Sequence, residues 1–153
     1  MSQVGLLEGG SRVPLIANWP GTTPAGVVRK ELVDFSDVHP TFVAFAGAKP
    51  AADRKLDGQS FAPQLLGEKG EPREWVYVQL DDRRNVRSDR WKLTSNDEFF
   101  DMKEAPHRQI PVTTDTTDAD ALAARAKLHA ALVRLKAEDA GDPPTKRKKG
   151  KKG

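Results

Sequence analysis

Few residues of this chain have the types and spacing that chemistry requires. The 153 residues include no cysteine, which excludes disulfides, thiolate metal sites and a cysteine nucleophile. The three histidines, His39, His107 and His129, stand far apart, so no two have the i, i+4 spacing that places a pair of imidazoles on one helix face for a metal. Asp81-Asp82 lies between two predicted strands, and we interpret it as a solvated turn.

A glycine pair near the start of the chain, in Glu8-Gly9-Gly10-Ser11-Arg12, is the clearest sign of a special loop. Paired glycines adopt backbone angles closed to other residues and let the chain approach a neighbour or a ligand closely. The apolar run Val13–Ala17 then predicts a buried strand, although so short a run does not exclude a helical segment. Pro14 restricts it to a sheet edge or a strand start, and Pro20-Gly21 predicts a turn after it.

The next stretch predicts one more strand and one helix. Apolar residues within 27–35 predict the strand, and the helix is predicted over Asp37–Ala46 by its apolar spacing. Ser36 or Asp37 can cap that helix with a side-chain oxygen, and Gly47 ends it. Residues 48–73 are mostly loop, with one helical turn predicted at residues 63–67.

The last third of the chain predicts a small sheet with a covering helix. Residues 75–80 have strand composition, 85–94 alternate loosely, and 98–102 form a further strand, so an antiparallel meander is expected. A helix is predicted over residues 118–138, and its apolar positions repeat at intervals of three and four so that they cover one sheet face. These positions are Leu122, Ala126, Leu128, Ala131, Leu132 and Leu135.

Charge is divided unevenly along the chain. Six of the 25 basic residues lie in residues 146–152, which leaves residues 1–145 with 19 basic and 22 acidic residues, a net charge of −3. The pI of about 9.2 therefore reflects the tail. We expect this tail to be disordered and to serve solubility, with weak polyanion binding by counterion release as the alternative.

Membrane insertion and export are not indicated by the sequence. No run is long enough to span a membrane. Residues 1–10 lack the cationic start and the apolar stretch of a signal peptide. We therefore expect no membrane association and, for the chain as written, a cytoplasmic location.

Five stretches in series resemble the sulfatases. Glu8–Gly21 has the pattern E-G-G-x-R-V-P-L-I-x-x-W-P-G, which is similar to a motif late in the catalytic domain of sulfatases of the arylsulfatase and N-acetylgalactosamine-6-sulfatase type, within the alkaline-phosphatase-like superfamily. The segments that follow resemble the same family in the same order, and the last two resemble its R-x-x-x-[YW]-K-L and E-L-Y-D-L segments. They are Glu31–Thr41 with Ala46–Ala48, Leu56–Phe61, Val86–Leu93 and Glu98–Met102.

The resemblance implies a fold class and a division of the chain. The fold would be an α/β fragment, the end of an alkaline-phosphatase-like domain, followed by a small α+β subdomain made of an antiparallel sheet with one covering helix. Residues 1–48 would end the catalytic domain and 49–73 would connect it to the subdomain at 74–139. Residues 140–153 would be the disordered basic tail.

The resemblance also implies chemistry whose parts are missing from these residues. The family uses a formylglycine made from the cysteine or serine of a C/S-x-P-S-R segment, together with calcium held by aspartate-rich pairs, and the sequence has neither motif. A sulfate-binding lysine is implied five residues before Glu8, where Gln3 stands. We therefore expect no catalytic residue, no metal ligand and no cofactor in this chain. Glu8, Gly9, Gly10 and Arg12 would line an active-site rim, or Glu8 and Arg12 would hold the loop by a structural ion pair.

The functional expectation is a C-terminal fragment of a sulfuric ester hydrolase that is inactive alone. Its partner would be a missing N-terminal catalytic half. The alternatives are a non-catalytic interaction module, a complementing subunit of a split sulfatase and, least favoured, a nucleic-acid-binding protein that uses the tail. We expect residues 1–48 to pack poorly in the isolated chain, because their strands lack neighbours, whereas residues 74–138 should fold as a unit.

Overall fold

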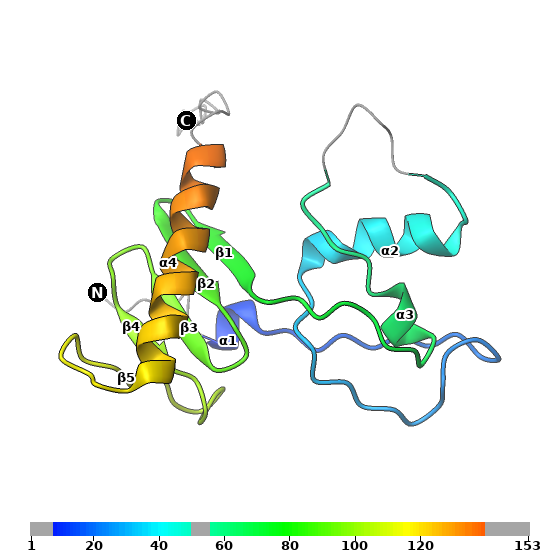
Figure 1. The fold of residues 1–153 in the computed structure, drawn as a ribbon. Helices are drawn as coiled ribbons and strands as arrows, with labels where there is room; N and C mark the ends of the chain where they lie inside the picture. The colour runs from blue at the N-terminus through cyan, green and yellow to red at the C-terminus, as the bar shows by residue number, and fades with distance from the viewer. Residues whose placement is uncertain (1–7, 50–55, 140–153) are drawn as a thin grey trace, which may run out of the picture.

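The structure, a computed structural model, describes residues 8–49 and 56–139. Two parts lie next to each other (Figure 1). The sheet part, residues 74–139, holds all the strands and the longest helix of the described residues. The helical part, residues 13–49 and 56–73, holds short helices and long stretches without regular structure. The chain enters the sheet part at α1 (Glu8–Ser11), crosses the helical part and returns to the sheet.

The sheet is an antiparallel meander in chain order, as the sequence predicts, but it has five strands where three were predicted, and β5 was not foreseen. The segment predicted as one alternating stretch, 85–94, forms parts of two strands, because a turn at Ser88 reverses the chain and the Ser88 N–H bonds to the Trp91 carbonyl at 2.8 Å. Asp81-Asp82 forms the two-residue turn of the first hairpin, and both residues are exposed. The strands are β1 (Val76–Leu80), β2 (Arg83–Arg87), β3 (Trp91–Thr94), β4 (Phe99–Asp101) and β5 (Ile110–Pro111).

Helix α4 (Ala119–Asp139) crosses one face of this sheet and closes the main core (Figure 1). Trp91 and Phe99 stack at 5.2 Å between ring centroids beneath it. The predicted inward face is correct at four positions, but Leu122 and Ala126 are exposed. The helix is rich in alanine, so its apolar pattern is weak and the sequence does not fix its rotation. The buried core consists of Val86, Trp91, Leu93, Phe99, Ala121, Leu128 and Ala131.

The helical part is organised by one buried carboxylate. Asp37 is 2% exposed and precedes α2 (Val38–Phe45), at the end of the 3-10 helix η1 (Phe35–Asp37). Its oxygens accept hydrogen bonds from the backbone N–H groups of Asp34 and Gln59 and from the guanidinium of Arg73. Asp37 thus joins the turn before α2 to the chain that leads into β1.

The predicted helix is confirmed, but its cap differs from the prediction. Asp34 caps η1 through a reciprocal capping box with Asp37, whereas Asp37 makes no side-chain capping bond to α2. The predicted helical turn is confirmed as α3 (Ala62–Leu65). The N–H of Phe61 donates to the Thr41 hydroxyl at 3.0 Å, so α3 is tied to α2. The domain boundaries stay a prediction.

The strands predicted over residues 13–17 and 27–35 are absent from the described structure. Both segments lie outside regular elements, apart from Phe35, which begins η1. A strand needs a neighbouring strand to satisfy its backbone groups, and no described residue pairs with either segment. Most of their large apolar side chains are exposed, as are Trp19 between them and Phe42 of α2. The exposed side chains of the two segments are Val13, Leu15, Ile16, Val27, Val28, Val33 and Phe35.

Candidate functional site

The carboxylate of Glu8 is buried against the sheet face that α4 leaves free. Glu8 is 3% exposed, and its Oε1 lies 3.3 Å from Nε of Arg87 in β2. Val86 and Leu93 are cross-strand partners in the core beneath α4. Side chains alternate along a strand, so Arg87 and its partner Lys92 point to the opposite face. Glu8 therefore approaches the sheet from the side away from α4.

Two cationic side chains lie next to each other where the Glu8 carboxylate contacts the sheet. Arg87 and Lys92 are directly opposed on adjacent strands, and like charges in that arrangement destabilise a sheet. The Glu8 carboxylate offsets this repulsion with a negative charge. Because the side chains of Glu8 and Arg87 are 3% and 15% exposed, this ion pair is shielded from salt far more than a surface pair.

Lys92 is buried, although a lysine in a strand of this kind is ordinarily expected on the surface. It is 2% exposed, and its ammonium donates a hydrogen bond to Oε1 of Gln109 at 3.1 Å. Burial lowers the pKa of Lys92, because the charged form loses its hydration. Glu8 opposes this shift, Arg87 adds to it, and burial prevails.

Three buried polar side-chain atoms at this face have no hydrogen-bond partner among the described residues. They are Oε2 of Glu8, Nδ2 of Asn85 and Nε of Arg87, whose contact with Glu8 is an ion pair and not a hydrogen bond. Asn85 is 2% exposed and stands two residues before Arg87 in the same strand, so its side chain lies on the same face. We call Glu8, Asn85, Arg87 and Lys92 the polar layer. Buried polar groups that lack a partner lower the stability of the fold. The polar layer therefore favours polar or charged groups in whatever segment packs against it.

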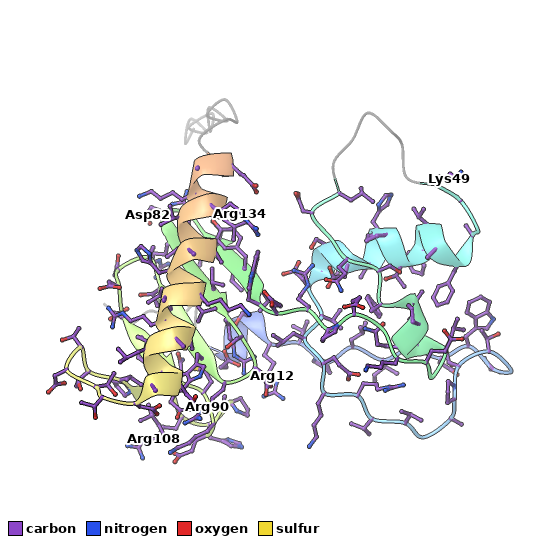
Figure 2. All side chains as sticks on the ribbon, viewed as in Figure 1. Arg12, Lys49, Asp82, Arg90, Arg108 and Arg134 are labelled. Carbon is purple, nitrogen blue, oxygen red and sulfur yellow. The ribbon has the colours of Figure 1, made fainter. Side chains whose placement is uncertain are left out.

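The residues predicted at an active-site rim do not share one environment. Glu8 belongs to the polar layer, whereas Gly10 and Arg12 are exposed. Figure 2 shows Arg12 beside α1, where the chain leaves the sheet part. The alternative prediction, a structural ion pair that holds the loop, applies to Glu8, and its partner is Arg87 of the sheet. Whether Glu8, Gly9, Gly10 and Arg12 line an active site stays a prediction.

Calcium does not fit the donors that the described residues offer. Among residues 8–49 and 56–139, no three histidine or acidic side chains gather closely enough to hold a metal ion. His39 is exposed on α2, and His107 and His129 are exposed elsewhere. No segment of the sequence has the C/S-x-P-S-R pattern from which a formylglycine is made. Neither calcium nor formylglycine chemistry can therefore be derived from these residues, and Gln3 lies outside the described ones.

Arg87 and Lys92 are the residues that sequence reasoning missed. Both fall in the segment Val86–Leu93 that resembles a sulfatase motif, but the sequence does not show which charge faces them. The sequence did indicate that Arg87 and Lys92 are neighbours, because two cations that flank a short turn face each other in an antiparallel hairpin. Burial of Lys92 could not be inferred, since a lone lysine is seldom buried.

No helix among the described residues has both the length and the apolar character to cross a membrane.

The basic tail at 140–153 lies outside the described residues, so its predicted disorder and polyanion binding stay predictions.

Comparison with known proteins identifies relatives over most of the chain. Residues 5–138 match the family described as N-sulphoglucosamine sulphohydrolase, C-terminal. The chain is 45% identical to mouse arylsulfatase G over 60 residues, which is 39% of this chain and 11% of that protein. It is 47% identical to human arylsulfatase D over 64 residues, which is 42% of this chain and 11% of that protein.

A solved structure supports the same relationship at the level of the fold. A crystal structure from Bacteroides thetaiotaomicron, described as that of a sulfatase, matches with a TM-score of 0.51 and 28% sequence identity, over 70% of this chain and 26% of that one. The relatives agree with the predicted fold class, a sulfatase α/β fragment followed by an antiparallel subdomain. The chain spans about a tenth of the length of the two arylsulfatases (11% of each).

Proposed function

We propose that this chain, which belongs to the sulfatase family, is the C-terminal part of a sulfuric ester hydrolase and is inactive without the catalytic part of that enzyme. The family match over residues 5–138 supports the assignment to sulfatases. The absence of a C/S-x-P-S-R segment supports inactivity of this chain alone, because the family's nucleophile is made there. In a full-length enzyme, the bound calcium and the formylglycine would supply charge neutralisation and the nucleophile.

The observation that carries the proposal is the exposed apolar surface of residues 13–42. Ile16 is 87% exposed, Val28 86% and Phe35 88%, and exposed apolar surface of this kind marks an interaction site. Residues 13–17 and 27–34 also leave backbone groups without strand partners among the described residues. Such segments are suited to joining the sheet of another domain. We assign the α/β catalytic domain of a sulfatase as that partner, since the relatives are about nine times longer than the part that matches.

The residues of this chain would position a sulfate-binding side chain and would not themselves make or break a bond of the substrate. The segment of α1 and Arg12, which we call the loop 8–12, leaves the sheet part next to the exposed apolar surface. Its Arg12 is exposed. A guanidinium binds oxyanions through paired N–H donors, so Arg12 is suited to a sulfate group at the junction of the two parts. In this proposal the sheet part holds the loop, and the apolar surface holds the catalytic domain.

The test is the size and activity of the native protein in extracts of its source. Antibodies against the sheet part would follow the protein through size-exclusion chromatography while fractions are assayed with an aryl sulfate. We expect the antigen to elute with sulfate-ester hydrolysis, in a species much larger than the 16.8 kDa of this chain. The purified 153-residue chain should release no sulfate. The same extract, fractionated, tests the expected cytoplasmic location.

Two outcomes would overturn the proposal. An antigen that elutes at 16.8 kDa without any sulfatase activity would favour the alternative, a non-catalytic interaction module. Hydrolysis by the purified chain itself would contradict its inactivity. A large active species made of two separate chains would support the proposal and identify a split enzyme.

A further inference from the structure

The turn of helix that carries the glycine pair is too short to hold its own shape. Helix α1 has four residues, and two of them are Gly9 and Gly10. The first helical turn costs more conformational entropy than its hydrogen bond returns, and each glycine is less favourable in a helix than alanine by about 1 kcal/mol. The conformation of α1 must therefore be imposed by contacts outside it.

The contact that meets this need is the insertion of Glu8 into the polar layer. The Glu8 carboxylate lies against Arg87, and the Glu8 backbone carbonyl accepts a hydrogen bond from the N–H of Arg12 at 2.8 Å. The side chain of Glu8 is thus joined to the sheet while its backbone is joined to Arg12. Through this ion pair and this hydrogen bond the sheet controls where the exposed end of the loop lies.

The two cations that face Glu8 are next to the most buried residues of the sheet. Arg87 follows Val86 in β2, and Lys92 precedes Leu93 in β3; Val86 and Leu93 are both 0% exposed and form the centre of the core. Side chains on a packed sheet hold a functional loop more firmly than a loop holds itself. Lys92 is fixed further by its hydrogen bond to Gln109.

We propose that Arg87, assisted by Lys92, is a positioning residue of the sulfatase site: it holds the Glu8 carboxylate in the polar layer and so sets where the loop 8–12 presents Arg12. This inference rests on the proposed function for its link to sulfate-ester hydrolysis. Its structural half, the control of loop order by Arg87, stands independently of that function. Arg87 and Lys92 touch no substrate in this proposal and act through Glu8.

A positioning role differs from simple stabilisation in what a substitution disturbs. If the ion pair only stabilised the fold, its loss would loosen the loop and the sheet together. If it positions the loop, its loss frees residues 9–12 while the strands and α4 keep their order. Glu8→Gln removes the negative charge at nearly constant shape, and Arg87→Gln removes the positive charge.

The first experiment measures backbone amide order parameters by NMR in the 153-residue chain. We expect residues 9–12 to be rigid in the wild type, near 0.85, and to fall below about 0.6 in Glu8→Gln and in Arg87→Gln, with the amides of β2 and β3 unchanged. Arg87→Lys should recover part of the order. The matched control is Arg108→Gln, whose ion pair with Glu104 lies on the surface, and it should change nothing in the loop.

Either of two results would overturn the inference. One is an unchanged loop in both glutamine variants. The other is a loss of order in β2 and β3 that equals the loss in the loop, since it would assign the pair to global stability. If Arg87→Gln does not fold, Glu8→Gln decides between these results alone.

The second experiment measures hydrolysis of an aryl sulfate by the native active species. We expect Arg87→Gln to lower kcat/KM by about tenfold to a hundredfold, as misplaced substrate-positioning groups do, and Arg87→Lys to recover part of it. Unchanged kinetics with a disordered loop would refute the catalytic half of the inference. Absence of any active species would refute the proposed function instead, and the loop measurement would still decide the structural half.

Discussion

The two parts of this molecule are held together by different forces. The sheet part buries a continuous apolar core between α4 and one sheet face, with Val86 and Leu93 fully enclosed. Among its described residues, the helical part buries only two apolar ones, Phe61 and Ala62, beside the polar Asp37 and Thr41, and exposes most of its large apolar side chains. Apolar burial is the dominant stabilising force in a folded domain, whereas a hydrogen bond contributes about 1 kcal/mol net. The sheet part should therefore be stable by itself, and the helical part should depend on its contacts.

The difference also explains where interaction with other molecules is expected. A part that exposes its apolar residues gains most from a partner that covers them. A part that hides them gains little. The exposed apolar surface and the loop 8–12 lie on or next to the helical part, so we expect that side of the molecule to meet the rest of the enzyme.

The largest expected effect is the loss of a core leucine. Leu93→Ala should lower the free energy of unfolding by about 2 to 5 kcal/mol, because a cavity forms at a fully buried site. The same substitution in the helical part, Leu15→Ala, should cost less than about 0.5 kcal/mol, since Leu15 is 56% exposed. Urea unfolding followed by tryptophan fluorescence measures both. Equal costs would show that the two parts do not differ as described.

The second prediction breaks the polar centre of the helical part. Asp37→Ala leaves the guanidinium of Arg73 without its carboxylate and should cost about 3 kcal/mol locally. We expect faster amide hydrogen exchange in α2 and unchanged exchange in β3. Asp57→Ala removes an exposed carboxylate nearby and serves as the control. Faster exchange in β3 as well would mean that the two parts unfold as one unit.

The third prediction concerns the pH dependence of stability. Burial lowers the pKa of Lys92 in the folded chain below its ordinary value of about 10.4. Below the folded pKa the cost of burying the ammonium is fully present. As pH rises past the folded pKa toward the unfolded one, the unfolded state holds more protons, so the folded chain gains stability.

Lys92→Met isolates this titration from all the others. The stability of the wild type relative to Lys92→Met should rise with increasing pH below the ordinary lysine pKa of about 10.4. The charged groups that face Lys92 are Glu8, Arg87 and Glu98, and they are present in both proteins. Thermal unfolding at several pH values measures the difference. A difference that does not change with pH would contradict the buried titration.

The smallest expected effect on the fold comes from the basic tail, which lies outside both parts. Removal of residues 145–153 deletes six basic residues and should change the free energy of unfolding by less than about 0.5 kcal/mol. Binding to duplex DNA should be weak and lost on deletion, with a slope of log affinity against log salt of about −5 before deletion. Undiminished binding by the shortened chain would assign polyanion recognition to the folded parts.

Local elements were predictable where the sequence carries strong patterns. The helices at 38–45 and 119–139 and the meander follow from apolar spacing and turn residues. Two strands in the first third were predicted wrongly, because a strand exists only with a neighbour and the pattern cannot supply one. The same limitation affected Lys92, which is buried and interacts with Glu8, a residue more than eighty positions earlier in the chain.

The sequence by itself determined the family, the meander with its covering helix and the absence of the family's nucleophile from this chain. Motifs, turn residues and apolar periodicity involve residues that are close together in the sequence, so they can be recognised without a structure. Only the tertiary structure decided that Glu8 meets Arg87, that Asp37 joins distant segments and that α4 rotates Leu122 outward. Each of these contacts joins segments that are far apart in the sequence. Strand register, burial and charge determine such contacts, and they are set only when the chain folds.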